Sequence, residues 1–166
     1  NNNISLIEDT VKIQEYEHSS IRTPELYFGY KFANNRDQIG NSEGFQKNQI
    51  VDYRLPENLS KNHFYLEGQW KNNHDSMKLI SAPGKIILEY HAKQVNIVAA
   101  GDTELEILID GEKMKEKISG NDMISSKIRI LEPRLYNIVE SEYGETHTII
   151  IKIDEPNFEI FTFTFG

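Results

Sequence analysis

The last ten residues restrict most strongly what this chain can fold into. They read NFEIFTFTFG, and Phe161, Phe163 and Phe165 recur at every second position, which is the period of a β-strand. Three phenyl rings on one face of a strand are too much apolar surface to leave in water, so another part of the fold must cover them. We therefore expect a core strand that completes a β-rich domain.

From Thr23 onwards the chain consists of short β-like runs separated by turn residues. Leu105, Ile107 and Ile109 share one face of such a run, and residues 149–153 repeat the pattern. Roughly ten short strands with turns every 8–12 residues are typical of an antiparallel sandwich or barrel. We predict an all-β fold, an antiparallel β-sandwich of the jelly-roll type. The expected strands are residues 26–32, 49–55, 63–70, 85–92, 94–99, 104–110, 128–131, 134–139, 146–153 and 158–165.

Two segments with different composition are expected. Residues 1–22 form a polar lead-in or linker, and residues 23–166 form the sandwich domain. Ser5 and Glu8 have the spacing of a capping box, so a short helix is an alternative for the lead-in. The first residue is Asn1 rather than Met, which favours a fragment of a longer protein over a mature chain.

Composition excludes several classes of function. The 166 residues include 18 Lys and Arg against 26 Asp and Glu, a formal net charge of −8. This acidic surplus disfavours nucleic acid and anionic lipid as partners. No apolar run approaches the roughly 18 residues of a membrane span. Cysteine is absent, which excludes disulfides, thiolate catalysis and cysteine-ligated zinc in this chain.

No catalytic motif is present, so we expect neither an enzyme nor a cofactor. There is no G-x-S-x-G elbow or phosphate-binding glycine loop, and the five histidines lack zinc-site spacing. Asp102 with Glu104, and Asn121 with Asp122, are oxygen-rich turns and hence weak calcium candidates, although such turns are usually only turns.

Five residues are candidates for ligand contact. Trp70, Tyr65, Tyr90 and Tyr136 offer aromatic rings on which a sugar could stack, and Arg134 offers a fork for a carboxylate or hydroxyl pair. Trp70 alternates in phase with the apolar positions of its run, which favours burial. The tyrosines at 65 and 90 stand opposite the apolar phase and so favour a groove on the sheet. For Arg134 a structural ion pair, with Glu25 or Asp110, is the stronger interpretation.

Seven segments, in the same order along the chain, resemble the C-terminal domain of DipZ-type thiol:disulfide interchange proteins. Together they extend over residues 23–166. In one place the chain departs from the family pattern, because Glu112 stands where the family often has proline after the hairpin. The segments are TPELYFGY (23–30), YRLP with a following Leu (53–59), LEGQW (66–70), HAKQVNIV (91–98), DG (110–111), RLYNIV (134–139) and FTFG (163–166).

The resemblance implies a function that composition does not. It implies a non-catalytic jelly roll, likened to carbohydrate-binding modules, that follows a thioredoxin-like domain in one chain outside the cytoplasm. Carbohydrate or envelope glycan would be the ligand. Two alternatives stay open: a domain that docks on the redox domain or on a client protein, and, more weakly, a glycoside-active enzyme with two cleft carboxylates.

Overall fold

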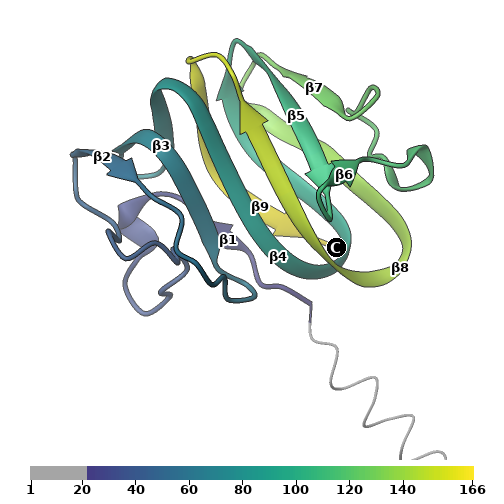
Figure 1. Cartoon of the computed structure of the whole chain (residues 1–166), viewed down its shortest axis with the longest axis horizontal. Coiled ribbons are helices and arrows are strands. Elements are labelled where there is room, and N and C mark those ends of the chain that lie inside the picture. Colours follow the sequence, from purple (N-terminus) through teal and green to yellow (C-terminus); the bar gives the residue numbers. More distant parts are fainter. Residues whose placement is uncertain (1–21) are drawn as a thin grey trace, which may run out of the picture.

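The structure, a computed structural model, describes residues 22–166 and consists almost entirely of antiparallel β-strands (Figure 1). Two single-turn 3-10 helices interrupt the connections. The elements are β1 (Leu26–Tyr27), η1 (Tyr30–Phe32), β2 (Ile50–Tyr53), β3 (Phe64–Asn72), β4 (Met77–Gly101), β5 (Thr103–Ile109), β6 (Glu112–Lys113), η2 (Glu116–Ile118), β7 (Lys127–Ile130), β8 (Arg134–Ile153) and β9 (Phe158–Phe165).

The strands form two layers that share β4 and β8. The first half of β4 and the second half of β8 lie between β3 and β5, with β2, β6 and β7 at the edges; we name this layer the large sheet. The second half of β4 pairs with β9 and with the first half of β8, and β1 pairs with β9; we name this layer the small sheet. In Figure 1, β9 lies behind the large sheet.

The two long strands turn from one layer into the other at shifts in their pairing register. The register between β4 and β8 slips between Ala92 and Gln94, and again between Val95 and Asn96. Such irregularities bend a strand and increase its twist, which lets one strand serve both layers of a sandwich. The sequence predicted two separate strands in each of these places.

Aromatic side chains from both layers meet in the core. Phe28, just after β1, stacks on Phe64 of β3 with ring centroids 4.0 Å apart and lies 5.7 Å from Phe163 of β9. Trp70 of β3 meets Phe158 of β9 edge-on at 6.2 Å. These contacts join β3 to β9 and so hold the large sheet against the small one.

The prediction of an all-β antiparallel sandwich is confirmed, while the jelly-roll subclass stays a prediction. The prediction that three phenylalanines of β9 share one core face is wrong. Phe163 is buried and Phe165 packs against the core, but Phe161 is not part of it, because the register shifts opposite Val98 and Ala99 and places Ile160 inside instead.

The expected lead-in helix lies outside the described residues. Among those residues, no helix is long and apolar enough to cross a membrane.

Candidate functional site

The structure buries all four aromatic ligand candidates. Trp70 and Tyr90 have no exposed surface, Tyr136 has 1% and Tyr65 has 3%. The burial of Trp70 agrees with its place among the alternating apolar positions of its strand. The interpretation of Tyr65 and Tyr90 as rings lining an open groove is wrong, because neither ring is accessible to a ligand.

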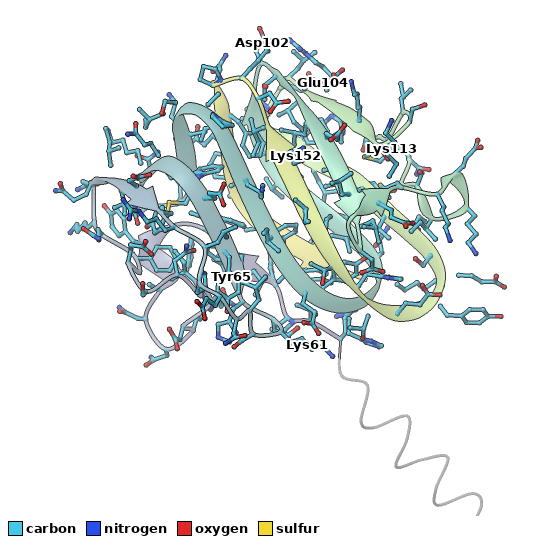
Figure 2. All side chains as sticks on the ribbon, viewed as in Figure 1. Lys61, Tyr65, Asp102, Glu104, Lys113 and Lys152 are labelled. Carbon is cyan, nitrogen blue, oxygen red and sulfur yellow. The ribbon has the colours of Figure 1, made fainter. Side chains whose placement is uncertain are left out.

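Tyr65 and Tyr90 are covered in different ways. Tyr65 points to the outer side of the large sheet, but loops close over it: the Ser60 N–H donates to its hydroxyl at 2.7 Å, and Gly40 lies against its ring (Figure 2). Tyr90 instead faces the core, in phase with Ile86 and Leu88, and its hydroxyl has no hydrogen-bond partner among the described residues. Neither ring can therefore act as a stacking platform.

Arg134 is half-exposed and makes structural contacts. Its guanidinium donates to Asp122 at 2.9 Å, lies 3.5 Å from a carboxylate oxygen of Glu132, and covers the ring of Tyr136 at 3.8 Å. The Tyr136 hydroxyl donates to the carbonyl of Glu132. An ion pair is thus observed, but with different carboxylates from those the sequence suggested.

The oxygen-rich turns have protein partners. Asp102 pairs with Arg129 and Glu104 with Lys127 across β5 and β7, at one end of the large sheet (Figure 2). Asp122 accepts from Arg134 and from a backbone N–H. Within residues 22–166 no cluster of three or more acidic or histidine side chains is arranged to hold a metal ion.

A different set of aromatic side chains reaches the surface at the edge of the small sheet. Tyr27 and Phe32 lie 4.8 Å apart, ring centroid to centroid, and both are half-buried. The guanidinium of Arg36 lies 4.5 Å from the Tyr27 ring and 5.7 Å from the Phe32 ring, and the Lys31 ammonium lies 5.6 Å from Phe32. We name these four residues the aromatic–cation cluster.

Local geometry explains why these four residues meet. Leu26 is buried, so the alternation of β1 turns Tyr27 outward, and the turn of η1 then brings Phe32 back over it. The side-chain amide of Gln38 fixes the backbone here, since it accepts from the Tyr27 N–H at 2.9 Å and donates to the Glu25 carbonyl at 2.8 Å. The Tyr27 hydroxyl donates to Glu25, and that hydrogen bond, followed by burial, raises the pKa of Tyr27.

The outer face of the small sheet continues from this cluster with a mixed surface. Tyr27 stands opposite Thr162, which is followed across the sheet by Val98 and Leu135. The next row is polar but covered, because Asn96 and Asn137 are both buried; Asn96 donates to Thr164 at 3.3 Å and accepts from Asn137 at 2.8 Å. Four strands set about 4.8 Å apart give this face a width of roughly 15 Å, enough for a short run of sugar units.

A third aromatic ring, that of Tyr30, extends the cluster along η1. Tyr30 is half-buried, meets His74 edge-on at 6.1 Å, and has the Lys47 ammonium 5.7 Å from its ring. Its hydroxyl donates to Asn48. Aromatic rings and cations therefore alternate along this edge.

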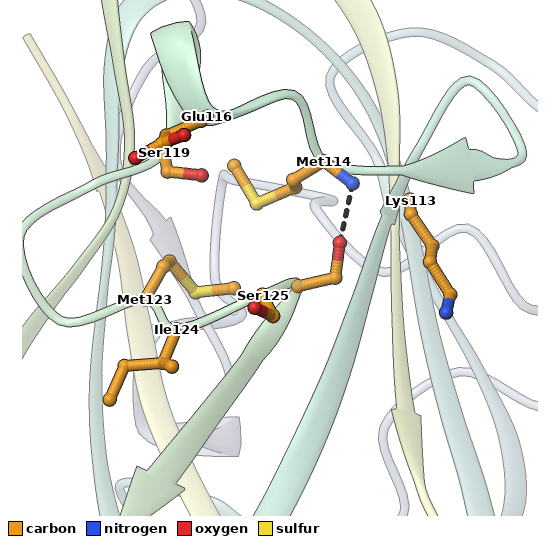
Figure 3. A pocket seen from close by; sticks show the side chains of 8 residues that line it. Lys113, Met114, Glu116, Ser119, Met123, Ile124 and Ser125 are labelled. Carbon is orange, nitrogen blue, oxygen red and sulfur yellow. Dashed lines mark hydrogen bonds between the residues drawn. The ribbon is translucent and has the colours of Figure 1, made fainter.

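A pocket lies in another part of the fold. It has a volume of about 520 Å³ and lies between η2 and the segment before β7, where Met114, Met123 and Ile124 form its apolar walls (Figure 3). Ile124 is 79% exposed. Ser126 closes one side by accepting a hydrogen bond from the Met114 N–H.

A histidine held by two carboxylates borders a smaller pocket of about 190 Å³. His147 bonds Asp110 through Nδ1 at 2.6 Å and Glu145 through Nε2 at 2.7 Å. Burial alone would lower the pKa of His147, but the hydrogen bonds to these carboxylates raise it above its ordinary value. With both ring nitrogens engaged, His147 is a structural bridge between β8 and the hairpin after β5.

Sequence reasoning missed the aromatic–cation cluster. Residues 33–49 have the composition of a loop, so nothing in the linear pattern singles out Arg36. The only available signal was Tyr27 inside the TPELYFGY segment. Its contact with Phe32 and Arg36 depends on a turn that strand periodicity does not describe.

Comparison with known proteins identifies the family of the chain. Residues 23–166 match the family described as the thioredoxin like C-terminal domain. The match covers most of the chain, so the chain belongs to this family. The resemblance noted from its seven segments is thereby confirmed.

Two relatives are 29% identical to the chain over 145 residues: Protein DipZ of Mycobacterium bovis and Protein DipZ of Mycobacterium tuberculosis. The aligned region covers 87% of this chain but 18% of each relative. The chain therefore spans less than a fifth of the length of these relatives.

Proposed function

We propose that this domain is a non-catalytic accessory module of a thioredoxin-like thiol:disulfide oxidoreductase and that it binds carbohydrate, such as an envelope glycan, outside the cytoplasm. Membership of the thioredoxin like C-terminal family and the much greater length of the DipZ relatives support a place after a thioredoxin-like domain in one chain. Such a module would raise the effective concentration of the redox domain near its ligand.

The aromatic–cation cluster is the observation that carries the carbohydrate proposal. A sugar ring packs its CH face on an aromatic side chain, while its hydroxyl groups need polar partners nearby. Tyr27 and Phe32 supply half-exposed rings, and the guanidinium of Arg36 and the carboxylate of Glu25 are exposed polar groups beside them. Arg134 is the first residue of β8, which forms the edge of the small sheet opposite β1. We keep it as a proposed contact for the carbohydrate.

Affinity electrophoresis through native gels that contain soluble polysaccharides tests the proposal. We expect one glycan to retard the chain, and Phe32→Ala to weaken that binding about two- to tenfold, the worth of one aromatic contact. Tyr143→Ala is the matched control, because Tyr143 is an exposed ring on β8 (67% exposed) outside the cluster. No retardation by any glycan, or an equal loss in both variants, would count against a sugar site here.

The pocket around Ile124 favours a second function, a protein-interaction domain. Methionine side chains adapt their shape to a partner, and Ile124 adds an exposed apolar side chain to the same pocket as Met114 and Met123. This second function is tested by calorimetric titration of the domain with the region that precedes it in the longer protein. Ile124→Ser should abolish binding, whereas Ile50→Ser, on the exposed part of β2, should not.

A further inference from the structure

The cations of the aromatic–cation cluster define the chemical class of the glycan. We propose that the ligand is a polysaccharide that contains uronic acids, with one carboxylate bound by Arg36. This inference rests on the proposed carbohydrate function and adds a charge requirement to it.

The positive side chains at this edge are not used by the fold. Among the described residues, Lys127, Arg129, Arg134 and Lys152 form ion pairs, whereas Arg36, Lys31 and Lys47, like the other described lysines and arginines, form none. Arg36, Lys31 and Lys47 differ from the other unpaired cations because they lie beside the rings of Tyr27, Phe32 and Tyr30. Three cations without a carboxylate partner among the described residues thus lie against aromatic rings at one edge of a chain whose net charge is −8.

Arg36 is prepared to bind a carboxylate in particular. Its side chain is exposed and makes no hydrogen bond to any described residue, so all five N–H donors are available. Stacking on Tyr27 and Phe32 limits the orientations of the guanidinium plane, which lowers the entropy lost when a ligand binds. A guanidinium fork matches the two oxygens of a carboxylate, and this charge-assisted pair is stronger than a neutral hydrogen bond.

The neighbouring groups fit a sugar that carries that carboxylate. While the acid group meets Arg36, the pyranose ring can lie over Phe32 and toward Thr162 on the small sheet. Lys31 adds a second positive charge beside Phe32. A flexible acidic peptide would use the same cations but has no rigid CH face for the rings.

The test is a calorimetric comparison of a soluble polyuronate with the same polymer after reduction of its carboxyl groups to primary alcohols. We expect the polyuronate to bind about 10- to 100-fold more tightly than the reduced polymer, as one charge-assisted pair implies. Arg36→Gln should cause the same loss, and Arg36→Lys a smaller one, because lysine keeps the charge without the fork. Arg54→Gln, at another exposed arginine, is the control and should bind like the unchanged chain.

The outcomes separate this inference from the proposed function. Equal binding of both polymers, unaffected by Arg36→Gln, would overturn the uronate inference and leave carbohydrate binding intact. Binding of neither polymer nor any neutral glycan by the folded chain would overturn both. Binding of polyglutamate as tight as that of the polyuronate would assign the cluster to acidic peptides and overturn the inference.

Discussion

Replacing Tyr90 by phenylalanine should make this protein more stable. The Tyr90 hydroxyl is buried and finds no hydrogen-bond partner within residues 22–166, while its ring stacks on Phe165 with centroids 6.1 Å apart. An unpaired buried hydroxyl costs about 1–3 kcal/mol, and phenylalanine keeps the ring contact without that cost. We expect the free energy of unfolding to rise by about 1 kcal/mol, which for a domain of this size is an increase of about 3 °C in Tm.

Tyr53 provides the opposite case in the same core. Its hydroxyl donates to the Gly44 carbonyl at 2.7 Å and accepts from the Asn72 amide at 3.0 Å. Burial raises the pKa of Tyr53 to about 12, and burial, with smaller contributions from two carboxylates, raises the pKa of Tyr90 as well. Both phenols are therefore neutral at pH 7. Tyr53→Phe should lower the free energy of unfolding by about 1 kcal/mol, because it leaves buried partners unpaired.

Urea unfolding followed by tryptophan fluorescence measures both changes. Trp70 is the only tryptophan and is fully buried against Phe158, so its emission reports loss of the core. The two variants should move the urea midpoint in opposite directions with unchanged slope. If Tyr90→Phe destabilises the protein as much as Tyr53→Phe, the Tyr90 hydroxyl is satisfied in the folded state and the reasoning fails.

Two further predictions concern the charge bridge and the packing of glycine. The pKa of His147 is raised in the folded state, so the charged histidine stabilises the fold fully below its ordinary pKa near 6.5, and this contribution is lost as the pH rises through the raised value. The difference in stability between the unchanged chain and His147→Gln, measured from urea midpoints between pH 5 and 9, should therefore shrink at high pH. A difference that stays constant with pH would contradict the charge bridge. Gly29→Ala should destabilise the folded protein by about 1–3 kcal/mol, because the added Cβ would lie 2.2 Å from the Asp75 Cα. Gly144→Ala is the control: its added Cβ meets only ordinary contacts, so the urea midpoint should change little. Equal effects of the two substitutions would disprove the packing explanation.

The strands that sequence predicted best are those with unambiguous alternation. Leu105, Ile107 and Ile109 were expected on one face, and all three are buried. They pair directly with the alternating isoleucines of β8, Ile107 with Ile151 for example. In these strands one residue in two is apolar and the other is polar or half-exposed, so only one assignment of residues to the core face fits the pattern.

The continuity of β4 could not be predicted from its composition. Ser81, Ala82, Pro83 and Gly84 have turn chemistry, yet the strand runs through them. In the structure Gly68 of β3, at positive φ, lies beside the Pro83 carbonyl, so an irregularity in the neighbouring strand accommodates the proline. Such compensation between strands is tertiary and has no local signal.

The site was mispredicted for two separate physical reasons. In β4 the run Ile86-Ile87-Leu88 is apolar on both faces, so the phase of Tyr90 was ambiguous, and it proved to point inward. Tyr65 does point outward as its phase indicated, but loop residues 40 and 60 cover it. Periodicity tells which side of a strand a residue occupies, and it does not tell what folds over that side.

Local charge, rather than the total, decides which ligand the aromatic–cation cluster can bind. At physiological salt the Debye length is about 8 Å, so acidic side chains farther than this from Arg36 repel a bound carboxylate only weakly. At about 0.01 M salt that length grows to roughly 30 Å, and the net charge of −8 acts on the ligand as a whole. We therefore expect the affinity for a polyuronate to pass through a maximum as salt increases, because high salt screens Arg36 and low salt restores the repulsion. A neutral glycan should show no such maximum, and an affinity for the polyuronate that only falls with added salt would show that a broader positive surface, not this cluster, holds the ligand.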